Sequence, residues 1–171
     1  MAVTIDCWST LLRQLDSNGA LRRRGAALAD LARRRGREIT PEAAMELIDR
    51  SWALHLDEWR GGRAFGPEGA ARWCLDELCL AATAPDLDEL AEAIATGTLA
   101  VGTAVVDGAA EALQALHRAG IPTALICDTG FTPSWVVREA MRMHHLTLDH
   151  FFFSDEVGTP KPYPPMFLAA L

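Results

Sequence analysis

The chain has 171 residues, half of them hydrophobic, and carries a formal net charge of −7 with an isoelectric point near 5.2. This length indicates a single domain, with room for an insertion, and a hydrophobic core of useful size. The acidic balance argues against a nucleic-acid-binding surface as the main function.

The sequence shows no pattern typical of a membrane span, a signal peptide or a zinc site. No apolar run approaches the ~20 residues that span a bilayer, and the first residues lack the charged and apolar regions of a signal peptide. The four cysteines form no Cys-x-x-Cys pair, and no histidine spacing completes a zinc site. We therefore expect a cytoplasmic protein with reduced thiols and with neither a membrane nor a nucleic acid as its partner.

The first predicted element is a short strand at residues 3–5, whose apolar and β-branched side chains are typical of a buried position. It ends on Asp6. In open parallel sheets, ligands bind beyond the carboxyl ends of the strands. Asp6 could serve there as a nucleophile, a base or a metal ligand. The alternative is that Asp6 only caps a turn or the next helix.

A helical block follows, with no convincing strand in it. Its breaks at glycine and proline and its apolar spacing predict four helices, at residues 20–36, 41–60, 67–82 and 86–96. The block is too long for one crossover connection, so we expect an insertion that lies as a lid over the carboxyl ends of the strands. Its arginine runs at residues 22–24 and 33–35 are expected to be solvated helix faces rather than a phosphate or RNA patch.

Aromatic residues recur at helical spacing in the second of these helices. Trp52, Leu56 and Trp59, with His55 beside them, are more typical of a buried core or cap interface than of a ligand site. Arg60 stands next to the Gly-Gly break that ends the helix. From this position Arg60 could reach a substrate carboxylate through paired hydrogen bonds.

From about residue 99, strands and helices alternate. The pattern predicts a helix at 109–119, a buried strand at 121–127, a helix from 132 to about 145, a strand at 151–154 and the start of a helix at 165. Such alternation implies a parallel α/β sheet with right-handed crossovers. The expected domains are an α/β core at residues 1–15 and 99–171 and an α-helical cap at 16–98.

Polar residues follow each of the three predicted strands. Asp6, Ser9 and Thr10 lie at the end of the first strand, residues 127–129 (Cys-Asp-Thr) at the end of the second, and Lys161 in the loop after the third. The carboxyl ends of parallel strands meet at one edge, so we expect these groups to share a site. A lysine there would hold Asp6 ionised and offset charge on a substrate oxyanion. A solvated loop lysine is the alternative.

These three segments, in this order and spacing, resemble the motifs of the haloacid dehalogenase (HAD) superfamily of hydrolases. Residues 6–11 (DCWSTL) resemble the first motif, whose leading Asp is a covalent nucleophile. Residues 124–130 stand where the second motif is expected, and residues 156–162 (EVGTPKP) resemble the third, with its Lys. The resemblance implies a Rossmann-like core with an inserted helical cap. It also implies catalytic roles for Asp6, Thr10 and Lys161, and substrate contacts by Trp8, Ser9, Cys127, Asp128 and Thr129.

Two positions depart from this family pattern. Trp8 stands where the phosphatase branch carries a second Asp as general acid and base, and an indole cannot shuttle a proton. The dehalogenase branch has an aromatic residue there and needs no metal, so Trp8 favours dehalogenase-like chemistry. A Mg²⁺-dependent phosphatase, with Asp6 as a metal ligand, is the runner-up. Cys127 replaces the expected Ser or Thr, and Thr129 could substitute for it.

The fourth motif of the family is expected on a further strand after the helix near residue 165, and the sequence given stops at Leu171. We therefore expect truncation before this motif, or a degenerate family member. Two hypotheses follow. The first is a HAD-like hydrolase that acts on a small halogenated or phosphorylated metabolite. The second is a non-catalytic or truncated HAD-like interaction module, and a homodimer through the exposed sheet edge is a further expectation.

Overall fold

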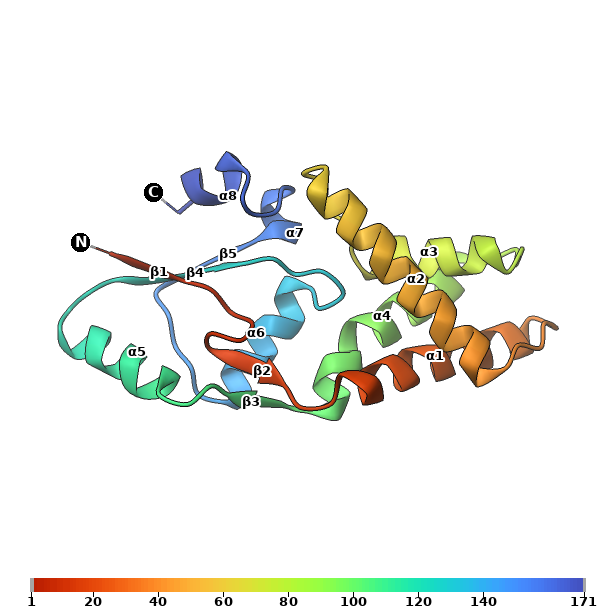
Figure 1. Ribbon diagram of the computed structural model, residues 1–171, viewed down its shortest axis with the longest axis horizontal. Helices are drawn as coiled ribbons and strands as arrows, with labels where there is room; N and C mark the ends of the chain where they lie inside the picture. The colour runs from red at the N-terminus through yellow and green to blue at the C-terminus, as the bar shows by residue number, and fades with distance from the viewer. Residues whose placement is uncertain (1, 171) are drawn as a thin grey trace.

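The computed structural model describes residues 2–170 and is built around a three-stranded parallel sheet (Figure 1). Its strands, in spatial order, are β1 (Val3–Ile5), β4 (Thr123–Cys127) and β5 (His150–Phe153). Val3 lies opposite Thr123, and Cys127 lies opposite Phe153. Every residue of β4 is buried, as expected for the central strand of a parallel sheet. The predicted α/β class is confirmed.

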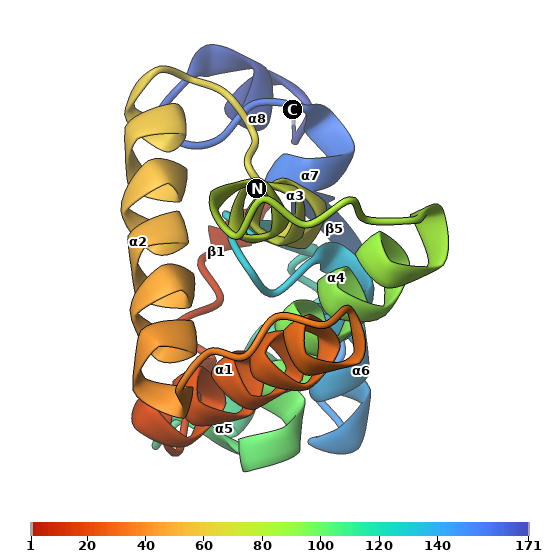
Figure 2. The ribbon, with the colours of Figure 1, turned by 90° about the vertical axis from the view of Figure 1, so that its right-hand side faces the viewer.

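Helices cover both faces of this sheet. Figures 1 and 2 show α5 (Ala109–Arg118) and α6 (Ser134–Met143) on one face and α8 (Pro164–Leu168) on the other. The short helix α7 (Ser154–Val157) directly continues β5. The sequence pattern did not predict α7, and the order of the sheet strands and of α5, α6 and α8 is the predicted one.

A two-stranded antiparallel ribbon, which the sequence pattern did not predict, joins the two halves of the molecule. It pairs β2 (Leu12–Gln14) with β3 (Thr103–Val105). One strand directly precedes the helical insertion and the other directly follows it. Both connections to the insertion therefore pass through one narrow ribbon.

The insertion consists of four helices, α1 (Ser17–Arg34), α2 (Pro41–Arg60), α3 (Pro67–Glu77) and α4 (Ala84–Val101). Thr40 caps α2 as predicted, and its hydroxyl accepts from the Ala43 N–H at 3.2 Å. The expected boundary at residue 98 falls inside α4, and the division into two domains stays a prediction. Within residues 2–170, none of the helices has the length and hydrophobicity needed to cross a bilayer.

Two clusters of buried side chains stabilise the two halves. The sheet cluster includes Leu12, Leu125, Val137, Met141 and Phe153. The helical cluster includes Leu28, Leu31, Ile48, Leu75, Leu90 and Ile94. Phe131, from the loop after β4, packs into the helical cluster. This loop therefore ties the insertion to the sheet at a second place besides the ribbon.

Phe153 gives a direct test of the sheet cluster. Its side chain is fully buried, so we expect Phe153→Ala to lower the free energy of unfolding by about 3–5 kcal/mol through lost burial and a new cavity. Urea unfolding measures the change. Phe167→Ala is the matched control, because Phe167 is 44% exposed and its truncation should stay within about 0.5 kcal/mol. Equal losses in the two variants would contradict this packing.

Candidate functional site

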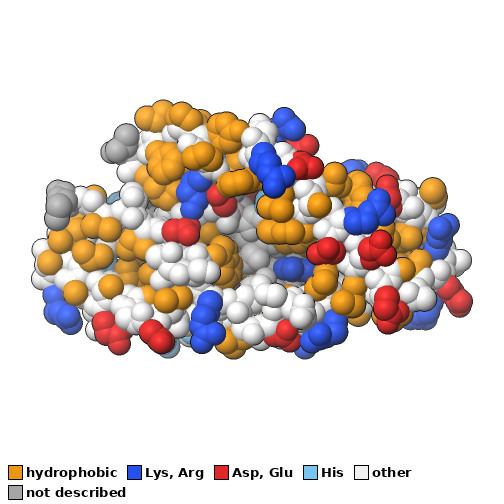
Figure 3. All heavy atoms as spheres, viewed as in Figure 1, with side chains coloured by type: hydrophobic (Ala, Val, Ile, Leu, Met, Phe, Trp, Pro, Cys, Tyr) orange, Lys and Arg blue, Asp and Glu red, His pale blue; other side chains and the backbone are white. Residues whose placement is uncertain are grey.

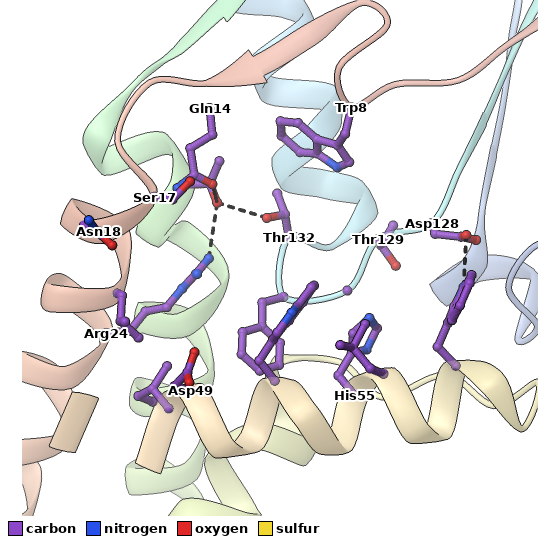
Figure 4. Close-up of a pocket in the computed structure, with 18 residues that line it drawn as sticks. Trp8, Gln14, Ser17, Asn18, Arg24, Asp49, His55, Asp128, Thr129 and Thr132 are labelled. Atoms are coloured by element: carbon purple, nitrogen blue, oxygen red, sulfur yellow. Dashed lines mark hydrogen bonds between the residues drawn. The ribbon is translucent and has the colours of Figure 1, made fainter. Parts of the chain in front are cut away.

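A cavity of about 580 Å³ lies between the carboxyl ends of the strands and the helical insertion. It opens as a hollow near the middle of the face in Figure 3, and Figure 4 shows its lining. This volume is in the range of small-molecule sites. The sheet side contributes Trp8, Asp128, Thr129, Gly130, Phe131 and Thr132. Helices α1, α2 and α4 supply most of the opposite wall.

Asp6 and Lys161 meet beside this cavity. The Lys161 Nζ donates to Asp6 Oδ1 at 2.6 Å and to the Ile126 carbonyl at 3.1 Å. Asp6 directly follows β1, and Lys161 comes from the loop between α7 and α8. Neither residue is part of the cavity lining, but Trp8, two residues after Asp6, is. The expected proximity of the carboxylate and the lysine is thus present in the structure.

The turn after Asp6 is closed by backbone hydrogen bonds. The Cys7 carbonyl accepts from the N–H groups of Thr10, Leu11 and Leu12 at 3.2, 2.8 and 3.0 Å. Ser9 adopts a left-handed conformation with φ of 62°. The Ser9 and Thr10 side chains are exposed and do not line the cavity. Direct contact of these two hydroxyls with a ligand in the cavity therefore stays a prediction.

Asp128 connects the helical insertion to the loop between α7 and α8 that carries Lys161, which we call the lysine loop. Its Oδ1 accepts from the backbone N–H of Lys161 at 2.9 Å, and its Oδ2 accepts from the Trp59 indole at 3.2 Å (Figure 4). The next residue, Thr129, donates its N–H to the Ser154 hydroxyl at 3.0 Å. Both residues after β4 that were expected to contact substrate do line the cavity.

Two expected substrate-binding residues lie elsewhere. Cys127 is fully buried, and a hydrogen bond with Cys7 together with burial raises the pKa of its thiol well above the usual value. It is a neutral thiol that lines no part of the cavity. Arg60 is exposed and pairs with Asp57 at 2.7 Å. Substrate contact by Cys127 or Arg60 does not fit these positions.

Arg24 is a site residue that the sequence reasoning missed. The run at residues 22–24 was expected to form a solvated face, yet Arg24 is half-buried and lines the cavity. Arg22 and Arg23 are exposed, as expected. The signal was spacing, because Arg24 lies three residues after Leu21 and four before Leu28, on the apolar face of α1.

Aromatic side chains of α2 face the same cavity. The Trp52 and His55 rings are stacked with centroids 4.6 Å apart, and both residues line the cavity with Trp59. The His55 Nδ1 lies 2.8 Å from the Phe65 carbonyl. Burial lowers the pKa of His55 below its usual value. This part of α2 is therefore both a cap interface and a cavity wall.

The lowered pKa of His55 predicts a pH-dependent stability. The unfolded state binds a proton near the ordinary pKa of 6.5, whereas folded His55 resists it. The free energy of unfolding should therefore fall as the pH drops below about 6.5. Urea unfolding between pH 5 and pH 7.5 measures this slope. We expect a shallower slope in His55→Gln, while His145→Asn, at an exposed histidine with positive φ, keeps the original slope. An unchanged slope in His55→Gln would contradict the assignment.

The described part of the chain holds no cluster of metal-ligating side chains around Asp6. Within residues 2–170, no group of three or more His, Cys, Asp or Glu side chains is placed to hold a metal ion. Mg²⁺ sites are built from carboxylates, waters and substrate oxygens in octahedral geometry. Asp6 as a Mg²⁺ ligand therefore stays a prediction, and the proposed reaction uses only the protein's own groups.

Three solved structures illustrate what the fold resembles. A HAD phosphatase from Thermococcus onnurineus superposes with a TM-score of 0.59 at 19% identity, over 98% of this chain and 68% of that one. A predicted phosphoglycolate phosphatase from Haemophilus somnus 129pt gives 0.53 at 14% identity, over 98% and 68%. An L-2-haloacid dehalogenase from Xanthobacter autotrophicus, with chloropropionic acid covalently bound, gives 0.50 at 17% identity, over 99% and 62%. At these identities the likeness establishes the fold alone.

The family follows from the sequence as a whole. No match was found among curated protein sequences. A family model described as haloacid dehalogenase-like hydrolase, however, matches residues 1–171. The match includes Asp6, Lys161 and the helical insertion between them. The chain belongs to the haloacid dehalogenase-like hydrolases.

Proposed function

We propose that the chain hydrolyses a small substrate through covalent attack by Asp6, with displacement of a halide from carbon as the favoured reaction. The observation that carries the proposal is the contact of 2.6 Å between Lys161 Nζ and Asp6 Oδ1. The lysine fixes one carboxylate oxygen, which leaves Oδ2 to attack. The ammonium group also offsets negative charge that develops beside it in the transition state.

The reaction proceeds in two steps. Asp6 Oδ2 forms a bond to the substrate carbon, and the carbon–halogen bond breaks as the halide leaves with the electron pair. Water then attacks the carbonyl carbon of the resulting ester. This attack releases the hydroxylated product and one proton and restores the Asp6 carboxylate.

Trp8 supports attack at carbon over attack at phosphorus. Its indole lines the cavity two residues after Asp6. A phosphate monoester usually expels an alkoxide, which needs a proton from a neighbouring acid. An indole cannot supply that proton, whereas a halide leaves without one. A substrate with a leaving group that needs no protonation fits this site best.

Other residues have supporting roles in the proposal. The hydrogen bonds of the turn after Asp6 use the N–H groups of residues 9–12 and not those of Cys7 and Trp8, which favours these two as donors to an anionic group beside Asp6. Asp128 positions the Lys161 segment through its hydrogen bond to the lysine N–H. Thr129 lines the cavity, which supports a role for it in contacting the substrate.

Oxygen labelling tests the proposal. The chain is incubated in H₂¹⁸O with 2-chloropropionate and, separately, with 4-nitrophenyl phosphate with and without Mg²⁺. We expect chloride release and, after several turnovers, ¹⁸O in the Asp6 carboxylate, detected by mass spectrometry of its peptide. Water must enter there because it attacks the ester carbonyl. Failure to release chloride, or turnover of the phosphate ester alone with ¹⁸O only in phosphate, would refute attack at carbon.

A further inference from the structure

Arg24 is unusual among the arginines of this chain. Its side chain is half-buried, and within residues 2–170 every other arginine is exposed. Its Nε donates to the Ile94 carbonyl at 2.8 Å, and its Nη2 donates to the Thr98 hydroxyl at 3.2 Å. Across the described part of the chain, no Asp or Glu forms an ion pair with it at 4.0 Å or less. The guanidinium therefore sits at the cavity without a counter-charge.

This placement is costly in the absence of an anion. A charge withdrawn from water needs an opposite charge or a full set of hydrogen bonds. Burial lowers the pKa of Arg24 to about 10, so the group is still protonated at neutral pH. The positive charge is thus a permanent feature of this end of the cavity.

The geometry of the guanidinium leaves one edge open. Nε and Nη2 lie along the same edge, which Ile94 and Thr98 occupy. The adjacent edge, formed by Nη1 and the second hydrogen of Nη2, accepts a carboxylate or phosphate through two parallel hydrogen bonds. Arg24 thus presents a preformed fork for an oxyanion.

The surroundings of Arg24 hold it in place: its guanidinium carbon lies 5.6 Å from the centroid of the Phe131 ring, and several polar groups adjoin it. The Thr98 hydroxyl donates to Gln14 Oε1 at 3.2 Å and lies 3.1 Å from the Thr132 hydroxyl (Figure 4). Ser17 and Asn18 also line this end of the cavity. An ordered cation among hydroxyl and amide groups is a suitable setting for a polar anionic group.

Gly97 makes room for the guanidinium. A Cβ at this position of α4 would lie 2.8 Å from Arg24 Nε. A glycine inside a helix costs about 1 kcal/mol relative to alanine. At this position the glycine permits the close approach of Arg24 to α4.

Neither of the two acids that line the cavity, Asp49 and Asp128, forms an ion pair with Arg24. Asp49 is exposed and forms no ion pair with Arg24. Asp128 already accepts from Trp59 and from the Lys161 N–H. Figure 4 shows Asp128 and Thr129 at one end of the cavity and Arg24, Ser17, Asn18 and Asp49 at the other. Asp49 thus stands near Arg24 without pairing with it, so a directly paired negative charge is one that a ligand would bring.

We propose that Arg24 binds a carboxylate or phosphate group carried by the substrate at the end remote from the atoms that react at Asp6. The substrate class is then a small molecule with a reacting end and a separate anionic end. That the anionic end is remote from the reacting atoms rests on the proposed role of Asp6, whereas the anion site at Arg24 does not depend on it.

Binding of unreactive probes tests this site without any turnover. The probes are propionate, inorganic phosphate and the neutral isostere propionamide, titrated by calorimetry or by the fluorescence of the cavity tryptophans Trp8, Trp52 and Trp59. For the unaltered chain we expect at least one anion to bind about tenfold or more tightly than propionamide. Arg24→Gln should lower the affinity for that anion about tenfold or more and leave the affinity for propionamide unchanged.

Three variants sharpen the result. Arg23→Gln makes the same change in net charge at an exposed neighbour outside the cavity and should leave anion binding unchanged. Arg24→Lys keeps the charge without the fork, so an intermediate affinity is expected. Gly97→Ala crowds the guanidinium while favouring the helix, so it should also lower the affinity for the anion. This variant tests the anion site if Arg24→Gln does not fold.

Equal anion affinities in Arg24→Gln and Arg23→Gln, no preference for either anion over propionamide, or no saturable anion binding would each overturn the proposal. These outcomes are independent of catalysis. A chain that binds the anion through Arg24 but releases no halide would refute only the proposed reaction. A chain that turns over through Asp6 with no contribution from Arg24 would refute only the anion site.

Discussion

Asp6→Asn is expected to reduce turnover at least about a hundredfold, because a side-chain amide does not form the covalent ester that the proposed reaction requires. The substitution keeps the size of the side chain and its position after β1. Initial rates of halide release from saturating 2-chloropropionate measure the effect. Residual activity above about one hundredth of the starting rate would remove Asp6 from the nucleophilic role.

A matched control separates this effect from a general loss of acidic charge. Asp107 lies in an exposed turn between β3 and α5, away from the cavity. Asp107→Asn changes the net charge by the same amount and should leave the rate of halide release unchanged. Urea unfolding of both variants checks that neither has lost its fold.

Lys161→Met is expected to lower kcat by about 10²–10³, the usual effect of removing a group that offsets charge in the transition state. Methionine retains an apolar stem of similar length but lacks the ammonium that contacts Asp6 and the Ile126 carbonyl. Lys161 is the only lysine in the chain, so no other lysine takes its place. Steady-state kinetics should show a fall in kcat larger than any change in KM.

Lys161→Arg tests whether charge is the reason. Arginine keeps the positive charge but is larger and planar, so partial activity is expected, above that of Lys161→Met. Equal loss in the two variants would mean that shape, and not charge, explains the role of Lys161.

The fold was largely predictable because its strongest signals are local. The Thr40-Pro41 start and the Gly61 stop place α2 where the sequence predicts it, and the continuous apolar run before Asp128 indicates the central strand. The β2–β3 ribbon was missed for a physical reason. Each strand has three residues, too few for a period-two pattern, and Gln14 pairs with Thr103 far along the chain.

The candidate site was predictable only where topology fixes it. Asp6 and Lys161 meet because each follows a strand that neighbours β4 in one parallel sheet. Which side chains the helical insertion places in the cavity wall depends instead on how its helices rotate and pack. Sequence spacing suggests this packing but does not determine it. Arg24 was therefore expected to face solvent but lines the cavity, and Arg60 was expected at the substrate but lies on the surface.

The two hydrogen bonds of Asp128 make the helical insertion and the lysine loop thermodynamically linked. One carboxylate receives donors from both, so a displacement of either segment removes a charge-assisted hydrogen bond of about 1.5–3 kcal/mol. A ligand that shifts α2 therefore changes the free energy of the position in which Lys161 contacts Asp6. By reciprocity, any change at the Asp6–Lys161 pair that moves the loop alters the affinity of ligands beneath α2 by the same factor.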